Sequence, residues 1–395
     1  MASTLFPSPA PEPARDAPPG DPPGPGPGIV SGRVAAPPAP DRPPEPQPVL
    51  SPLTTAAVFL VLTVDEGGEE TVRDLLGELG GLGRAFGFGA PDAALSCVAG
   101  IGSDVWDRLF DYPRPADLHP FQPIEGPRHS APATPGDLLF HLRATRSDLC
   151  FQFASEITKR LRGAVTLQDE VQGFTYLDFR DLLGFVDGTE NPVGPAAHDA
   201  VLVGDEDPAH AGGSYVIVQK YLHDLDAWNA LPVEAQERII GRTKATNIEL
   251  DAPGSHVDLN TVTGEDGEER QILRDNMPFG SPGRSEFGTY FIGYARTPAV
   301  TELMLDRMFL GVPPGGPDRI LDFSTAVTGT LFHTPSADFL DDLPPLPAST
   351  AGTAASGQDP QRELPAVPPP DPGPEPAAAG DGSLGIGNLN RSTLP

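Results

Sequence analysis

The chain has 395 residues, 50 prolines, 44 glycines and a formal net charge of −29. Such a charge excludes nucleic acid as a partner, because phosphates would be repelled rather than neutralised. So many prolines and glycines exclude a chain that is folded throughout. The excess lies at the two ends, so the sequence predicts a disordered tail at residues 1–49 and a disordered linker at 341–380.

Neither export nor membrane insertion is expected. The N-terminus lacks a basic and apolar leader, which predicts a cytoplasmic protein. The most apolar run, 53–64, is too short to span a bilayer and is rich in β-branched residues, which favours a buried strand. Cys97 and Cys150 lie in separate apolar segments without metal-ligand spacing, so we expect buried, reduced thiols.

Strands and helices are mixed in the first half of the folded region. In chain order we expect a strand at 56–64, a helix from 69 to about 80, a strand at 95–99, a helix at 103–110, a strand at 137–145, a helix at 147–162 and a strand at 165–176. Ser147 and Asp148 have the chemistry of a helix N-cap.

The second half repeats the mixture. We expect a strand at 214–221, a helix at 225–240, a strand at 289–295, a helix at 298–310 and a strand at 323–332. The repetition predicts an α+β fold of two packed units, one at 50–183 and one at 184–340.

Asp187 is the most informative acid in the chain. It stands between Gly184 and Gly188 at the end of an apolar run, and Asn191-Pro192 ends the segment. Glycines allow backbone geometry that other residues resist, so this carboxylate is held in position. An ordinary turn, with the Asp accepting its own backbone amides, would give the same pattern.

Three further residues are candidates for a site. A Pro-Gly-Ser turn leads directly to His256, although a lone histidine is more often structural than a ligand. Arg274 and Asn276 are two residues apart, so in an extended segment their side chains point to the same face. Together they could stabilise a developing oxyanion, although a solvated strand with a local ion pair would look the same.

Four segments together resemble the bacterial dye-decolorising peroxidases, most closely their B-type branch. They are 184–192, the turn at His256, 274–280 and 288–296, and they occur in the expected order. The resemblance covers about residues 52–340. It implies two ferredoxin-like domains that enclose one haem b per chain, bound mainly by the second domain, and it implies a homo-oligomer.

The resemblance also implies roles around the haem. His256 matches the axial ligand of the iron, and Asp187, Arg274 and Asn276 match distal groups that act on H₂O₂. How the work divides between Asp187 and Arg274 is open. Asp318 and Asp322 are both candidates for the carboxylate that accepts a hydrogen bond from His256.

Haem propionates need cations or amides at the rim of the pocket. Arg242, Thr189, Glu190 and Asn191 are candidates for these contacts, or ordinary surface residues. The aromatic residues that could relay electrons to a buried haem are Trp228, Tyr221, Tyr290 and Tyr294, and the sequence does not choose among them.

The function implied is a peroxidase that reduces H₂O₂ and oxidises dyes, phenols or similar one-electron donors. One alternative is a non-peroxidatic haem-binding or haem iron-releasing protein, which would share His256 but would not need Asp187 and Arg274 together. A second alternative is an enzyme like chlorite dismutase, against which the 184–192 motif argues.

The last segment, 381–395, carries a separate signal. Leu384, Ile386 and Leu389 form a small apolar set spaced by glycine and asparagine, suited to docking in a groove as an extended peptide. It resembles the peptide that loads peroxidase cargo into encapsulin shells. The linker at 341–380 would then be a stiff tether, and the predicted location is the cytoplasm, inside an encapsulin nanocompartment.

Overall fold

The computed structural model describes residues 42–348. The predicted targeting peptide at 381–395 and most of the predicted tail and linker lie outside the described residues. Among the residues that are described, no helix is long and apolar enough to cross a membrane. Cys97 and Cys150 are buried, free thiols, and burial raises the pKa of both.

The first half has the β-α-β-β-α-β order of a ferredoxin-like unit. Its main elements are β1 (Ala56–Val64), α1 (Glu69–Gly87), β2 (Ser96–Gly102), β5 (Leu138–Ala144), α3 (Ser147–Arg160) and β6 (Val165–Phe174). The strands pair antiparallel in the order β2-β5-β1-β6, so the fourth strand lies beside the first and the third lies between the first and the second.

The second half repeats this arrangement. Its main elements are β7 (Ser214–His223), β10 (Leu273–Arg274), β11 (Met277–Ser281), β12 (Glu286–Ala295), α8 (Pro298–Leu310) and β14 (Thr330–Thr334). The strand order is β14-β7-β12, with both β10 and β11 on the outer side of β12. β14 also pairs with β2, which joins the halves into one ten-stranded sheet. The predicted fold class, two ferredoxin-like units, is confirmed.

Shorter elements connect these strands and helices. They are α2 (Ser103–Leu109), β3 (Ile124–Glu125), β4 (Ser130–Ala131), α4 (Pro195–Val201), α5 (Leu225–Asn229), α6 (Val233–Ile240), α7 (His256–Asn260), β8 (Val262–Thr263), β9 (Glu269–Arg270), β13 (Ser324–Ala326) and α9 (Ala337–Asp341).

Several predicted elements need correction. The helix at 225–240 is two helices, α5 and α6, because Pro232 between them lacks the N–H that would continue the first. The strand at 323–332 is likewise two strands, β13 and β14. The N-cap of α3 is Arg146, and its side chain makes no capping hydrogen bond, so the capping predicted for Ser147 and Asp148 was wrong.

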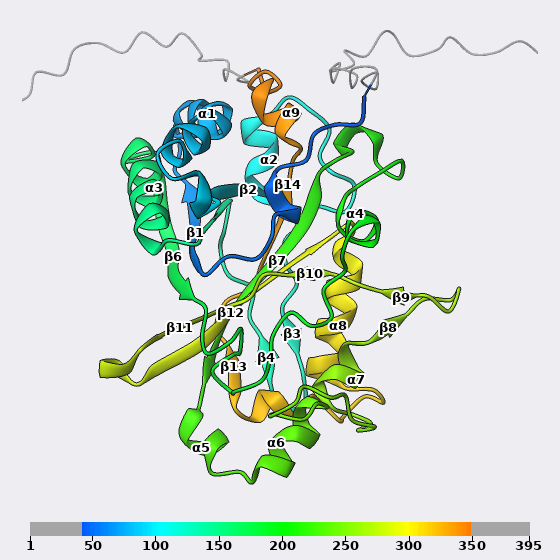
Figure 1. Cartoon of the computed structure of the whole chain (residues 1–395). Helices are drawn as coiled ribbons and strands as arrows, with labels where there is room; N and C mark the ends of the chain where they lie inside the picture. The colour runs from blue at the N-terminus through cyan, green and yellow to red at the C-terminus, as the bar shows by residue number, and fades with distance from the viewer. Residues whose placement is uncertain (1–41, 349–395) are drawn as a thin grey trace, which may run out of the picture. The chain divides into compact units, whose positions relative to one another are not determined.

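The sheet has two buried faces. Along β1, Val58, Leu60 and Leu62 belong to a core that also takes residues from α1, α2, α3 and α8. The alternate residues belong to a second core, in which Phe59 of β1 stacks on Tyr290 of β12 with ring centroids 4.2 Å apart. These two strands are not neighbours in the sheet, so the two halves pack face to face. α3 packs against β1 and β5, α1 against β2, and α8 against β7 and β12. Figure 1 shows α1 and α3 side by side on one flank of the first half.

The N-terminal segment closes the seam between the halves. Although the sequence placed residues 42–49 in a disordered tail, Gln47 and Val49 are buried. The Gln47 side chain donates to the Ala99 carbonyl at 2.9 Å and accepts from the Ala99 N–H at 2.8 Å. It also donates to the Pro335 carbonyl, just after β14, at 2.9 Å. One side chain therefore pairs with the backbone on both sides of the seam.

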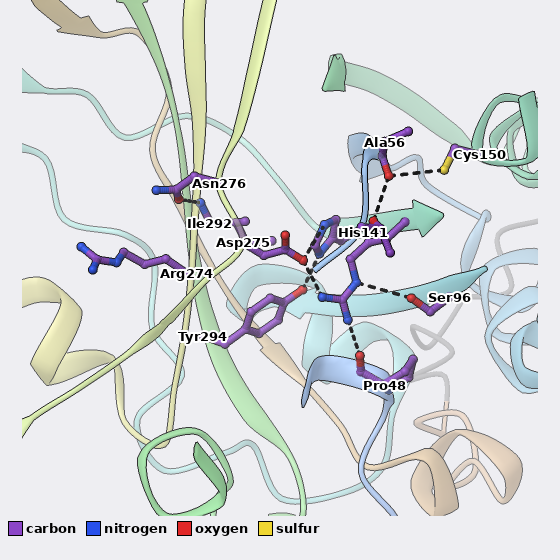
Figure 2. A network of polar contacts seen from close by, with 12 residues as sticks. Pro48, Ala56, Ser96, His141, Cys150, Arg274, Asp275, Asn276, Ile292 and Tyr294 are labelled. Atoms are coloured by element: carbon purple, nitrogen blue, oxygen red, sulfur yellow. Dashed lines mark hydrogen bonds and ion pairs between the residues drawn. The ribbon is translucent and has the colours of Figure 1, made fainter. Parts of the chain in front are cut away.

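A polar network lies between the two packed halves (Figure 2). Arg143 of β5 is fully buried and donates to the buried carboxylate of Asp275 and to the Pro48 carbonyl. Burial raises the pKa of Asp275, and the Arg143 charge opposes that rise. Nearby, the His141 Nδ1 lies 2.9 Å from the Tyr294 hydroxyl. The network ties the first half to the segment that carries Arg274 and Asn276.

Replacing one partner of the buried pair should weaken the fold strongly. Arg143→Met leaves the Asp275 carboxylate buried without its counterion, which typically costs about 3–5 kcal/mol of unfolding free energy. Urea denaturation at pH 7 measures this. Arg146→Met is the matched control, because Arg146 pairs with Asp148 on the surface and its loss should leave the midpoint unchanged. Equal urea midpoints for the two variants would contradict the prediction that Arg143 stabilises the fold by pairing with the buried Asp275.

Candidate functional site

A cavity in the second half contains almost all of the predicted site residues. It encloses about 1380 Å³ that protein atoms do not fill, part of which is open to solvent. Every residue that lines it lies between Asp181 and Ser324. Much of its wall is apolar, contributed by Leu183, Phe185, Ile240, Ile272, Phe291, Met304, Leu305, Met308 and Ile320. The apolar wall suits a largely apolar ligand.

His256 is the first residue of α7 and lines the cavity. The helix begins there because the Ser255 side chain accepts a hydrogen bond from the Asp258 N–H. The His256 Nδ1 lies 2.7 Å from Oδ2 of Asp318, whose side chain is fully buried. An Nδ1–H donated to this carboxylate leaves the Nε2 lone pair available to a metal.

The two candidate partners of His256 are therefore distinguished. Asp318 makes the contact, and its other oxygen accepts from the Ile320 N–H at 2.9 Å. Asp322 instead contacts the side chains of Arg128 and His129.

Asp187 is held by the backbone geometry that its flanking glycines allow. Gly184 and Gly188 have φ values of 95° and 75°, in the left-handed region. The Asp187 Oδ1 accepts from the Gly188 N–H at 2.7 Å, and its Oδ2 lies 3.1 Å from the Asn276 side-chain nitrogen. The Asn276 Oδ1 accepts from the Ile292 N–H at 3.1 Å, so the amide NH₂ faces Asp187. The carboxylate and the amide thus fix each other's orientation.

Arg274 and Asn276 both line the cavity, and Asp275 between them turns the other way. Figure 2 shows Asp275 directed toward His141, with Arg274 and Asn276 on the opposite side of the strand. This confirms that the two-residue spacing places both side chains on one face. The Arg274 Nε is buried and has no hydrogen-bond partner within the described residues. A buried guanidinium nitrogen left in this state favours an anionic or polar ligand nearby.

Asn191 has a different position from the one the sequence suggested. It is not among the cavity-lining residues. Its side-chain nitrogen donates to the Arg274 carbonyl at 2.7 Å, and its oxygen accepts from the Arg274 N–H at 2.9 Å. Asn191 therefore holds the main chain of Arg274.

The other predicted rim residues do line the cavity. Arg242 donates to Glu190 at 2.6 Å and to the Asn247 side chain at 2.9 Å, so its charge is already paired. Thr189 is exposed at the same edge. A second, smaller cavity reaches Asp187, Arg274 and Asn276, but His256 does not line it. The three polar residues therefore line both cavities, whereas His256 lines only the larger one.

Nothing in the sequence indicated that two of the residues lining the cavity, Asp181 and His223, belong to the site. Burial raises the pKa of Asp181 to about 7, and the nearby Asp187 adds to that rise. His223 is the last residue of β7. Its ring nitrogens contact the hydroxyls of Ser324 and Thr289, both at 2.9 Å, and burial lowers its pKa to about 4.

These residues fit a haem group. The cavity has an apolar wall for a flat ring and an imidazole whose free nitrogen could bind iron. It also has a carboxylate, an amide and a guanidinium with a nitrogen that lacks a partner among the described residues. Nothing in this set of donors conflicts with a bound iron porphyrin.

Comparison with known proteins identifies the family. Residues 46–175 match the model "Dyp-type peroxidase, N-terminal", and residues 178–339 match "Dyp-type peroxidase, C-terminal". The dye-decolorizing peroxidase of Mycolicibacterium paratuberculosis is 59% identical over 352 residues, 88% of this chain and 93% of that protein. That of Rhodococcus erythropolis is 56% identical over 351 residues, 88% of this chain and 97% of that protein.

Some relatives of lower identity are named deferrochelatase instead. A deferrochelatase of Yersinia pestis is 24% identical over 191 residues, which is 44% of each chain.

Solved structures agree with these matches. The encapsulated DyP-type peroxidase of Mycobacterium smegmatis has a TM-score of 0.76 and 63% identity, covering 77% of this chain and 100% of that one. DyPB of Rhodococcus jostii has a TM-score of 0.74 and 58% identity, covering 75% and 97%, and variants of it have been solved in complex with heme. The chain therefore belongs to the Dyp-type peroxidase family, the dye-decolorizing haem peroxidases.

Proposed function

We propose that this chain binds haem b in the cavity and reduces H₂O₂ there, while it oxidises dyes, phenols or similar small aromatic donors. Peroxidase activity follows from family membership, and the roles of individual residues are our proposal. One observation carries it: His256, whose Nδ1 contacts the buried Asp318, lines the same cavity as Asp187, Arg274 and Asn276.

His256 would hold the haem iron through Nε2, and Asp318 would make it a stronger donor by accepting the Nδ1 proton. When bound, haem supplies an iron with an open position for peroxide and a ring that takes up oxidising equivalents. Arg242, Glu190 and Thr189 would face the propionates at the rim. Asn191, which we first grouped with them, would instead position Arg274.

The distal residues would move a proton and stabilise charge. Asp187 would take the proton from the near oxygen of H₂O₂ and pass it to the far oxygen, which leaves as water. Arg274, whose Nε has no partner among the described residues, would stabilise the negative charge that develops on the leaving oxygen. Asn276 would keep the Asp187 carboxylate in the orientation that this transfer needs.

A haem-binding or iron-releasing role without peroxidase activity is not favoured. The relatives named deferrochelatase match less than half of the chain, whereas several dye-decolorizing peroxidases match most of it at more than twice the identity.

Removing either charged distal group should slow peroxide reduction. We expect Asp187→Asn and Arg274→Leu each to lower kcat/KM for H₂O₂ by about 10²- to 10³-fold, because one loses the proton acceptor and the other the charge stabilisation. Steady-state kinetics of haem-loaded protein measure this. Arg284→Leu, at an exposed turn, should match the wild type. The assigned roles fail if both distal variants keep full activity.

The His256–Asp318 pair should control the iron. His256→Ala removes the axial nitrogen, so the haem absorption spectrum of this variant should change. Asp318→Asn keeps the shape but loses the charge, and we expect about a 10- to 100-fold loss in haem affinity or activity. Asp322→Asn is the matched control, because Asp322 contacts Arg128 and His129 and not His256. An Asp318→Asn protein that behaves like this control would refute the assignment.

We also propose that the chain is encapsulin cargo in the cytoplasm. The M. smegmatis protein, 63% identical, is an encapsulated peroxidase. In this chain the docking peptide would be 381–395, with Leu384, Ile386 and Leu389 as its apolar contacts. This peptide lies outside the described residues. A homo-oligomeric state also stays a prediction.

Deleting residues 381–395 should abolish loading into co-expressed encapsulin shells, because the apolar contacts are lost. Co-purification of the peroxidase with intact shells measures loading. A chain with 381–395 in scrambled order keeps length and composition and should also fail to load. Both should retain wild-type peroxidase kinetics when free. Loading that survives the deletion would exclude this peptide as the signal.

A further inference from the structure

We propose that Tyr294, His141 and Asp275 form a second redox-active site in which Tyr294 loses an electron to the oxidised haem and its phenolic proton to His141. The inference rests on the proposed haem peroxidase function. It adds a place, outside the cavity, where one oxidising equivalent is held.

The geometry places a hydroxyl, an imidazole and a carboxylate in series. The Tyr294 hydroxyl lies 2.9 Å from the His141 Nδ1, and both side chains are fully buried. On the other side of the ring, the His141 Nε2 lies 3.8 Å from Oδ2 of Asp275. Figure 2 shows the His141 ring close to both the Tyr294 hydroxyl and the Asp275 carboxylate, with dashed lines marking the two contacts. The tautomer with the hydrogen on Nε2, the side nearer Asp275, lets Nδ1 accept from the tyrosine, and this Nε2 has no hydrogen-bond partner within the described residues.

The surroundings favour coupled loss of an electron and a proton. Burial raises the pKa of Tyr294 far above its usual value, so the phenolate does not form before oxidation. Burial, with the nearby Arg143 charge, lowers the pKa of His141 well below its usual value, so the ring is neutral at rest and the acidity of the oxidised phenol has to drive its protonation. An oxidised phenol is a strong acid, and His141 is the base already in contact with it. The positive charge gained by the ring would lie beside Asp275.

The three residues adjoin the haem cavity without lining it. Asp275 stands between Arg274 and Asn276, which both line the cavity, and adjacent Cα atoms are about 3.8 Å apart. Leu273 of β10 pairs with Tyr294 of β12. Asp275 therefore connects this group to residues that line the cavity, while bulky donors have no access to the buried Tyr294 ring.

Tyr294 differs from the other five tyrosines in the partner of its hydroxyl, and the structure describes all six. Its hydroxyl alone pairs with an imidazole, whereas that of Tyr221 donates to Gln219 and that of Tyr112 to the Ala209 carbonyl. Tyr290 is equally buried on the same strand but has no base in hydrogen-bond contact. A merely structural hydrogen bond between Tyr294 and His141 would carry no radical, so the two interpretations differ in a measurable way.

The step balances. The Tyr294 O–H bond breaks, the electron goes to the haem already oxidised by H₂O₂, and an N–H bond forms at His141 Nδ1. The product is a neutral phenoxyl beside an imidazolium. A later one-electron donor restores the tyrosine, and His141 returns the proton.

The test uses haem-loaded full-length protein mixed with H₂O₂, frozen within milliseconds to seconds and examined by electron paramagnetic resonance. We expect a tyrosyl signal in the wild type that narrows when the tyrosines are ring-deuterated. The signal should be lost in Tyr294→Phe and kept in Tyr290→Phe, the matched control. His141→Gln retains a hydrogen-bond partner but not a base, so it should also lose the signal. Haem content and thermal midpoint are measured for each variant.

A signal unchanged in Tyr294→Phe would overturn the inference, as would a wild type that consumes peroxide without any tyrosyl signal. If Tyr294→Phe does not load haem, His141→Gln decides the question by itself. Peroxide consumption is measured in parallel. A wild type that consumes peroxide without a tyrosyl signal refutes the Tyr294 site but leaves the proposed peroxidase function standing. A wild type that does not react with H₂O₂ would refute both.

Discussion

The buried pair of Arg143 and Asp275 is the constraint on which the site depends. Two charges taken out of water do not stabilise a fold by themselves, because desolvation offsets most of their attraction. This pair is tolerated because the Arg143 guanidinium also donates to Pro48 and Ser96. Its effect is geometric. It draws Asp275 into the interface between the two half-sheets, and the alternation of an extended strand then directs Arg274 and Asn276 to the opposite side, into the cavity.

The same principle recurs around the cavity, where side chains that we propose to be reactive are held by groups outside the proposed reaction. Asp318 orients His256, Asn191 fixes the main chain of Arg274, and the Ile292 N–H sets the direction of the Asn276 amide. Groups that are oriented before the ligand arrives need no reorganisation during the reaction, and this is the main source of electrostatic catalysis.

The sequence predicted features that depend on residues close together in the chain, and it missed features that depend on contacts between distant residues. Local pattern was enough for the strand at 56–64, for Asp187 between its glycines and for the shared face of Arg274 and Asn276. The resemblance supplied the roles of these residues. Local pattern could not decide between Asp318 and Asp322, because their contacts come from residues about 60 and 190 positions away. Nor could it find the target of Asn191, or the burial of Asp181 and His223, because long-range packing determines all three.

The seam between β2 and β14 has a consequence for synthesis on the ribosome. β2 emerges early, but β14, its partner across the seam, ends at Thr334 and emerges among the last of the described residues. Until then the outer edge of β2 offers unpaired N–H and C=O groups to any passing strand, a known route to aggregation. Gln47 is made before β2, and in the folded chain its amide pairs with both backbone groups of Ala99. β14 pairs with Ile101 and Gly102 and not with Ala99, so Gln47 satisfies a position of the edge that the last strand leaves open.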